Sequence, residues 1–339
     1  MPLNLDFPTL DQKKWEELIA KALKINSLDD FEPKTVAGVE LAPFNHPSEK
    51  ITRENPLISH NIDWKIGVSV DSNSQDANSA IINAVQNGAE AIILKGQNAN
   101  WQEHYADVFH EMIYNDVQIE SSQKLMTDFI SYSRSQNKNL EELTGSFSIT
   151  TDMLKANVAA AKQLASFHFF TGVSSSANVP DALIEIASQL KEAIELALEL
   201  NLNVSTIRAS INVDSHLAVN VSKIRALRII WANLLKAYKI EFQALFIKVI
   251  TVVNEDINDE TALIENTSAC INAALGMADL ICSFHNQDTN QSRLNQNIQH
   301  IMKMESYLNM VADPLAGSYS IEKITNHLAE ACWEKLAKN

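Results

Sequence analysis

Eight short runs of aliphatic and β-branched residues alternate with helical segments along most of the chain, and this alternation constrains the fold more than any other feature. Helical periodicity between the runs is clearest in 73–87, 153–165, 180–200, 217–238 and 259–277. Strands that alternate with helices form parallel sheets, so we predict an α/β fold, a (β/α)8 TIM-type barrel. An open doubly wound sheet would produce a similar alternation and stays open as the alternative. The strand-like runs are 65–71, 88–95, 117–120, 142–147, 167–173, 204–213, 243–253 and 279–285.

The first sixty residues differ from the rest. Residues 10–25 have apolar side chains at helical spacing, Trp15 among them, and predict an amphipathic helix. Residues 28–54 contain three prolines and few periodic apolar positions, which indicates an extended arm. We therefore expect two parts, an N-terminal helix and arm over 1–60 and a barrel over 61–339. An arm of this kind lies on its own barrel or on another subunit.

Charge and cysteine content exclude several classes of protein. The formal net charge is −15, whereas proteins that bind nucleic acid or anionic membranes carry the opposite sign. No run of 18 apolar residues predicts a membrane span, and the N-terminus lacks the pattern of a signal peptide. Cys270, Cys282 and Cys332 have no CxxC spacing, which predicts reduced thiols in a cytoplasmic protein without a metal site.

Polar residues at the ends of the predicted strands are the candidate lining of a cavity. Barrels of this type carry their chemistry at the carboxyl ends of the strands, although such ends are also simply solvated in many barrels. His168 lies inside an apolar strand and is expected to be a packing residue. The candidate lining residues are Asp71, Lys95, Glu120, Gly172, Ser174, Asp214, His285 and Asn286.

Two motifs in the second half of the chain resemble the methylmalonyl-CoA mutase family. Residues 304–322 resemble the family signature E-S-x-L-x-x-V-x-D-P-x-x-G-S-Y-x-x-E, and 223–232 resemble its K-x-R-A-x-R-x-L-W-A helix. The proline-containing arm and Trp15 are similar to the start of the small subunit, so Trp15 is an interface candidate by this likeness. The matching motif residues are Lys223, Arg225, Arg228, Trp231, Glu305, Ser306, Asp313, Pro314, Gly317, Ser318, Tyr319 and Glu322.

The sequence departs from the catalytic members of that family at the substrate site. They carry S-G-Y-H after the fifth strand, where Tyr and His address the thioester. Here Gly172 is kept, but Val173 and Ser174 occupy the Tyr and His positions. Valine has no polar group, and serine cannot act as an imidazole acid at neutral pH. Asp214-Ser-His216 partly resembles a cobalt-ligating Asp-x-His-x-x-Gly motif, but Val219 stands at the glycine position, so we interpret it as unrelated.

The resemblance and these departures imply a non-catalytic small subunit of an adenosylcobalamin-dependent methylmalonyl-CoA mutase. The large subunit would hold adenosylcobalamin and convert methylmalonyl-CoA to succinyl-CoA, while this chain binds no cofactor and lacks the C-terminal cobalamin-binding domain. The expected partner is that large subunit, and a homodimer of the isolated chain stays open. The alternatives are a stand-alone barrel that binds acyl-CoA or another small molecule, and an active barrel that borrows a cobalamin domain. Phe169, Phe170 and Phe284 would fill the barrel if they point inward.

Overall fold

Eight parallel strands close into a barrel in the order β10-β3-β4-β5-β6-β7-β8-β9. The structure is a computed structural model that describes residues 11–25, 34–41, 62–71, 74, 76–96, 114–119, 125–135, 137, 139–141, 143–164, 166–173, 179–254, 256–283 and 289–338. Because β10 pairs with both β9 and β3, the barrel prediction is confirmed and the open sheet is excluded. The strands are β3 (Lys65–Asp71), β4 (Ala91–Gly96), β5 (Tyr114–Ile119), β6 (Gly145–Ser148), β7 (Phe167–Val173), β8 (Ile207–Val213), β9 (Phe246–Thr251) and β10 (Leu280–Cys282).

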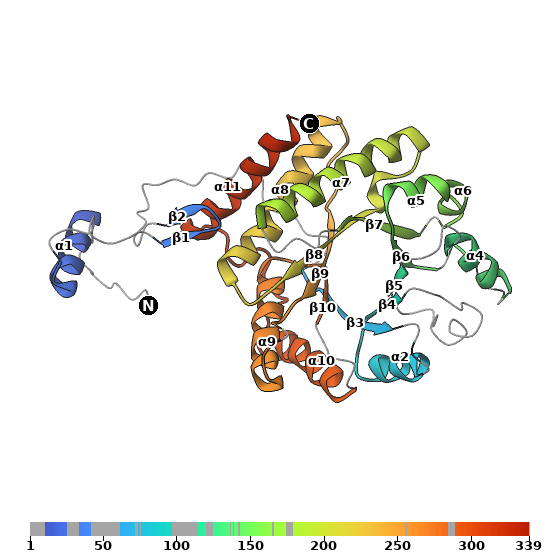
Figure 1. The fold of residues 1–339 in the computed structure, drawn as a ribbon, viewed down its shortest axis with the longest axis horizontal. Helices are drawn as coiled ribbons and strands as arrows, with labels where there is room; N and C mark the ends of the chain where they lie inside the picture. Colours follow the sequence, from blue (N-terminus) through green and yellow to red (C-terminus); the bar gives the residue numbers. More distant parts are fainter. Residues whose placement is uncertain are drawn as a thin grey trace, which may run out of the picture.

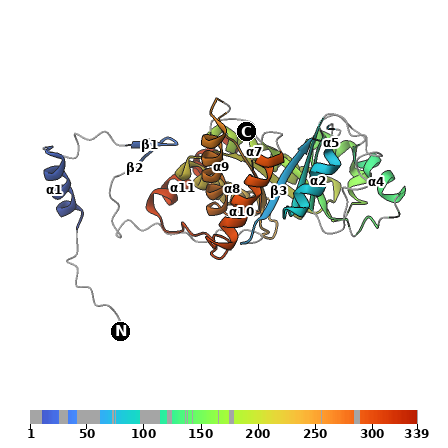
Figure 2. The same cartoon turned by 90° about the horizontal axis from the view of Figure 1, so that it is seen from below.

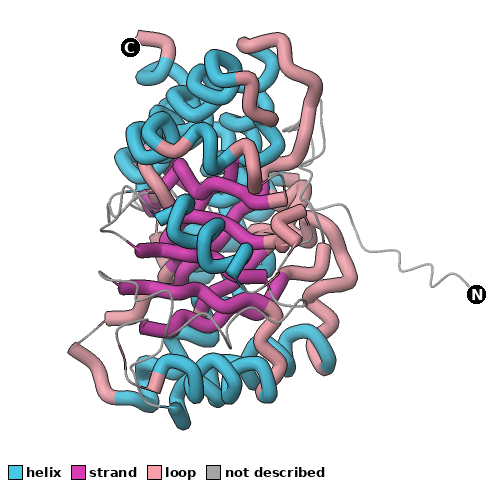
Figure 3. The backbone as a smooth tube through the Cα atoms, turned by 90° about the vertical axis from the view of Figure 1, so that its right-hand side faces the viewer, coloured by secondary structure: helices cyan, strands magenta, loops and turns pink. Residues whose placement is uncertain are grey.

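Helices surround the strands, as Figures 1 and 3 show. A short 3-10 turn over Val204–Thr206 precedes β8. Among the described residues, no helix is long and apolar enough to cross a membrane. The helices of the barrel are α2 (Ala77–Gln86), α4 (Leu125–Ser135), α5 (Thr151–Ala156), α6 (Val158–Ala161), α7 (Val179–Leu200), α8 (Leu217–Ala237), α9 (Asp259–Leu275), α10 (Thr289–Met304) and α11 (Tyr319–Leu336).

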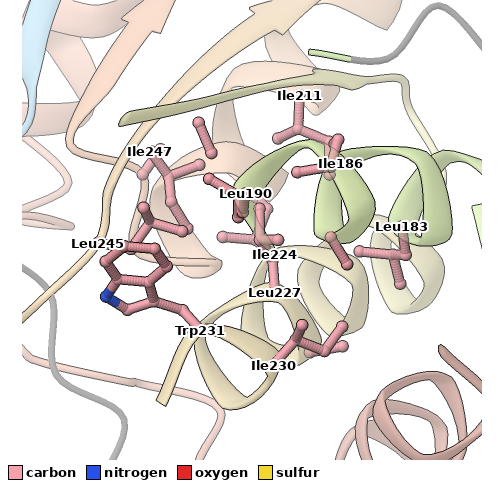
Figure 4. Close-up of a cluster of buried hydrophobic side chains, with 14 of the residues drawn as sticks. Leu183, Ile186, Leu190, Ile211, Ile224, Leu227, Ile230, Trp231, Leu245 and Ile247 are labelled. Atoms are coloured by element: carbon pink, nitrogen blue, oxygen red, sulfur yellow. The ribbon is translucent and has the colours of Figure 1, made fainter. Parts of the chain in front are cut away.

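The largest core lies between the barrel wall and helices α7, α8 and α11. Alternate residues of each strand point outward. On β8 and β9, Ile211 and Ile247 meet Leu190, Ile224 and neighbouring helix residues (Figure 4). Helix α11 packs on α8 and α7, so α8 is buried on most of its circumference. This explains why α8 carries buried charged residues that a surface helix would expose.

The N-terminal part contains one helix and one hairpin in its described residues. Helix α1 (Gln12–Leu23), which begins where Asp11 accepts a hydrogen bond from the backbone of Lys14, stands apart from the barrel in Figures 1 and 2. Strands β1 (Lys34–Val36) and β2 (Val39–Leu41) form a hairpin beside α11. The prediction of an extended arm over 28–54 is therefore wrong for residues 34–41, and the rest of that arm lies outside the described residues.

Candidate functional site

A lysine side chain crosses the interior of the barrel. Lys248 on β9 is 0% exposed, and its neighbours Ile247 and Val249 face the outer core. Its Nζ lies 3.4 Å from the hydroxyl of Ser148 on β6. Strands β6 and β9 are separated in the barrel by β7 and β8, so this contact spans the lumen. The middle of the lumen is therefore occupied by protein.

The amino-terminal half of the lumen is filled by other large side chains. On β8, Arg208 is largely buried, and its guanidinium lies 5.0 Å from the ring centroid of Phe246 on β9. His168 on β7 is half-buried, with Nδ1 3.4 Å from the carbonyl oxygen of Gly145. This agrees with its interpretation as a packing residue. Phe169, in contrast, packs outward in the cluster with Phe147 and Phe167, so it does not fill the lumen. The side chain of Phe170 lies outside the described part of the chain.

The structure brings two of the predicted lining residues together at the carboxyl ends of the strands. Asp71 on β3 is in register with Lys95 on β4. Asp71 also lines a cavity of about 200 Å³ between β3, α2 and α10, together with Asp76 and Arg293. That volume lies below the roughly 300–1,000 Å³ of sites for drug-sized ligands. The arrangement offers charged groups but no room for an acyl-CoA.

Other predicted lining residues give a mixed outcome. Glu120, Ser174, His285 and Asn286 lie outside the described residues, as does Phe284. Val173 is described by its backbone, which pairs with Ser210 after an irregularity in β7. Gly172 is buried, and a Cβ there would meet Ile186 and Leu190 of α7. Gly172 therefore faces the helix layer, and its prediction as a cavity-lining residue is wrong.

Asp214 shapes the turn between β8 and α8. Its carboxylate accepts hydrogen bonds from the backbone and the ring of His216, at 2.8 and 2.9 Å, and from Asn220 at 2.6 Å. Burial alone would raise the pKa of Asp214, but these hydrogen bonds outweigh it and hold the pKa below its usual value. The Asp214-Ser-His216 sequence thus begins a barrel helix, with the His216 side chain 77% exposed.

Lys223 supports the same end of the barrel from within α8. Its side chain is largely buried, and Nζ donates a hydrogen bond of 2.5 Å to the carbonyl of Asn212 at the end of β8. Burial lowers the pKa of Lys223 to about 8, although the negative charge of Asp214 acts to raise it. Lys223 therefore acts as a positioning residue for the β8 end.

The two family motifs meet in space at Arg225. Its guanidinium is fully buried on α8 and forms ion pairs with Asp313 and with Glu322, the latter at 2.5 Å. Glu322 also accepts a hydrogen bond from the backbone of Gly317. Arg225 thus fixes the turn after α10 and the first turn of α11 to α8.

Arg228 and Trp231 hold the amino-terminal end of the barrel, opposite the end that Lys223 supports. Arg228 donates to the carbonyl of Leu245 at 2.8 Å, to that of Met277, and to the Asp279 carboxylate at 3.0 Å. The Trp231 indole donates to Gln243. Since β9 and β10 begin just after these carbonyls, Arg228 and Trp231 set where both strands start.

The remaining predicted motif and interface residues lie at the surface or near it. Glu305, Ser306, Pro314 and Gly317 are exposed in the turn between α10 and α11, whereas Ser318 and Tyr319 are half-buried at the start of α11. Trp15 is half-buried on α1. Among the described residues, no group of three His, Cys, Asp or Glu side chains lies close enough to hold a metal.

Sequence reasoning missed the inward position of Lys248 and a polar network on α10. Gln299 donates to Ser283 at 2.6 Å and accepts from the Trp64 indole, while Asn295 accepts from Asn266. One signal was present for Lys248, because a charged residue interrupts the apolar run Phe246–Thr251 at an inward position of the strand.

Comparisons with known proteins identify the family. Residues 105–338 match the family model described as methylmalonyl-CoA mutase. The methylmalonyl-CoA mutase small subunit of Porphyromonas gingivalis (strain ATCC BAA-308 / W83) is 26% identical over 142 residues, which cover 38% of this chain and 23% of that protein. The small subunit from Streptomyces virginiae is 33% identical over 78 residues, or 21% of this chain and 13% of that protein.

These matches reach only part of the relatives. The matched stretches span less than a quarter of the length of either small subunit. Among solved structures, dihydropteroate synthase from Yersinia pestis is similar at 12% identity and a TM-score of 0.44, over 71% of this chain and 93% of that one; a likeness of this strength carries no argument about function. The family model, in contrast, covers more than half of the chain. The chain belongs to the methylmalonyl-CoA mutase family.

Proposed function

We propose that this chain is the non-catalytic small subunit of an adenosylcobalamin-dependent methylmalonyl-CoA mutase. In this proposal the large subunit converts methylmalonyl-CoA to succinyl-CoA, and this chain stabilises it as a cytoplasmic heterodimer. The observation that carries the proposal is the contact of Lys248 with Ser148 across the lumen. A CoA ester is long, so a barrel that admitted it along its axis would need an open lumen.

The polar groups at the barrel's carboxyl end support the same conclusion. Asp71 and Lys95 lie on neighbouring strands, but the Tyr and His positions of the catalytic relatives hold Val173 and Ser174. Asp214, His216 and Lys223 are engaged in fixing the β8–α8 turn. The tyrosine and histidine that address the thioester in the catalytic relatives therefore have no counterpart at these two positions.

The described residues also do not fit a cobalt-ligating loop. Val219 stands three residues after His216, at the position where such a loop has glycine. The ring nitrogen Nδ1 of His216 lies 2.9 Å from the carboxylate of Asp214. The peptide belongs to the start of α8 inside the barrel rather than to a separate α/β domain. We infer that adenosylcobalamin is held by the large subunit.

The test is reconstitution with the large mutase subunit encoded in the same genome. The two proteins are purified separately and mixed, and mutase activity and complex mass are recorded. The proposal predicts a one-to-one complex, no activity from this chain alone, and a more heat-stable large subunit in the complex. Absence of a complex at micromolar concentrations would overturn the proposal, and binding of CoA esters by the lone chain would then favour the binding-barrel alternative.

A further inference from the structure

Five large apolar side chains are exposed together at the amino-terminal end of the barrel. Here they are called the α10-turn surface: Ile301 is 50% exposed, Met304 69%, Tyr307 63%, Met310 68% and Val311 59%. They occupy the last turn of α10 and the connection to α11. A tyrosine side chain buries roughly 150–250 Å² and Ile, Met and Val somewhat less, so together the five present on the order of 500 Å². That lies at the upper end of the patches that monomers normally expose.

The same surface is poor in charge. Between residues 304 and 317 the sequence has two charged residues, Glu305 and Asp313. Asp313 is paired with the buried Arg225, so within 304–317 Glu305 is the exposed charge. Beside the turn, the carboxylate of Asp63 is half exposed and is paired with Lys303 at 2.9 Å. The other exposed residues there include Ala312, Pro314 and Ala316. Depletion of charge with enrichment of Tyr and Met is the composition of interface cores.

The turn is held rigidly in place. Asn309 donates to Asp63 at 3.3 Å, and the backbone N–H of Asp313 lies 3.2 Å from the sulfur of Met277. Tyr307 and Asp313 have left-handed backbone conformations, with φ of 54° and 46°. At Tyr307 this conformation is a common way for a helix to end, and the backbone N–H groups of Ser306 and Leu308 bond back to the carbonyls of Ile301 and Met302. A rigid surface loses little conformational entropy when a partner binds.

The charge of the whole chain favours a different protein over a second copy as the partner. Two copies would each carry a formal net charge of −15 and would repel each other at the distances of an interface. A patch of about 500 Å² approaches the ~800 Å² per partner of a standard interface. We propose that the α10-turn surface is the face on which the large mutase subunit docks, through an apolar and charge-poor surface of its own. This inference rests on the proposed function.

The experiment measures the affinity of the purified large subunit for variants of this chain by calorimetric titration. Met310→Glu places a charge at a side chain that is 68% exposed and that is not among the ion-pair partners of Arg225. Leu198→Glu, on the exposed side of α7 at 48% exposure, is the matched control. We expect Met310→Glu to bind at least tenfold more weakly, while Leu198→Glu binds like the unchanged chain.

Each other outcome contradicts the inference in a distinct way. If the unchanged chain binds and Met310→Glu binds equally well, this surface is wrong while the proposed function stands. If the unchanged chain does not bind, the proposed function fails and the inference fails with it. If Met310→Glu breaks a homodimer of the isolated chain, the occupant is a second copy. If Met310→Glu lowers the melting temperature of the isolated chain while Leu198→Glu does not, the chain covers this surface itself.

Discussion

Arg225 is the residue on which the two family motifs converge, and its replacement tests that contact directly. In Arg225→Met, the carboxylates of Asp313 and Glu322 stay close together without their cation. Breaking a buried ion pair by removing one partner costs about 3–5 kcal/mol. Urea unfolding should show a loss of this size. Arg134→Met, at an exposed arginine on α4, should change stability by less than about 0.5 kcal/mol. Equal effects of both substitutions would contradict a structural role for the motif.

Lys223 gives the stability of the protein a predicted dependence on alkaline pH. Burial lowers its pKa from 10.5 to about 8, so between these values the unfolded chain binds more protons than the folded one. Stability from this residue is therefore fully present above pH 10.5 and is lost as the pH falls through 8. The buried Cys270 works in the opposite direction, because burial raises its pKa from 9.0 to about 12.

The prediction for Lys223 is therefore stated as a difference from Lys223→Met. The free energy of unfolding of the unchanged chain should rise relative to the variant by about 2–3 kcal/mol between pH 8 and pH 10.5, as expected for the lowered pKa of Lys223. Denaturant unfolding of both proteins across this range measures it, and Cys270 cancels because both contain it. A constant difference would mean that Lys223 titrates normally in the folded state.

At the residue scale, local patterns identified the residues of the two family motifs but not the residues that they contact. Sequence spacing placed Arg225 and Asp313 in two separate motifs, and only folding brings residues so far apart together. Lys248 shows the limit of such reasoning, since a lysine in an apolar run reveals nothing of the serine three strands away. Gly172 shows another, because an irregularity between Phe170 and Gly172 shifts the alternation and turns it outward.

At the scale of elements, helix α7 supplies the clearest test of the outer core. Leu190 is 0% exposed between the barrel and α8, whereas Leu198 on the same helix is 48% exposed. Leu190→Ala should cost about 3–5 kcal/mol, because the surrounding barrel cannot collapse into the space. Leu198→Ala should cost less than about 0.5 kcal/mol. Chemical denaturation compares the two, and similar losses would mean that α7 does not pack as described.

The elements that sequence patterns predicted well are long and strongly periodic. The predicted helices at 180–200 and 217–238 match α7 and α8 closely. The helices α4 and α10 were not predicted, and buried polar residues explain the failure for α10. Gln296 and Gln299 lie on its buried face and hydrogen-bond to backbone carbonyls, so no apolar stripe marked it.

The hairpin of β1 and β2 was missed for a different reason. Its two-residue turn places Ala37 and Gly38 at φ of 51° and 80°, and alanine is not a residue that signals such a turn. Its apolar residues pack against the core beside α11, so the partner that stabilises the hairpin is far away in the sequence. A pattern that depends on a distant helix is invisible to local periodicity.

At the scale of the whole molecule, closure of the barrel was predicted from the number of strands rather than from any single strand. The weakest predicted strand, 142–147, corresponds to β6 (Gly145–Ser148), which is held by pairing with β5 and β7. Strand β10 is three residues long and still joins β9 to β3. Short strands such as these depend on their neighbours, so their bounds follow from the closed barrel and not from local propensity.

The last prediction concerns what the closed lumen excludes. A ligand that binds the folded state raises stability by RT ln(1 + [L]/Kd). Because Lys248 spans the lumen to Ser148 and the cavity beside Asp71 measures about 200 Å³, methylmalonyl-CoA at about 1 mM should leave the melting temperature of the isolated chain unchanged within a degree. The purified large subunit is the positive control and should be stabilised by several degrees. A comparable shift for this chain would show that it binds a CoA ester at a place other than the lumen. The barrel would then be a binding protein in its own right.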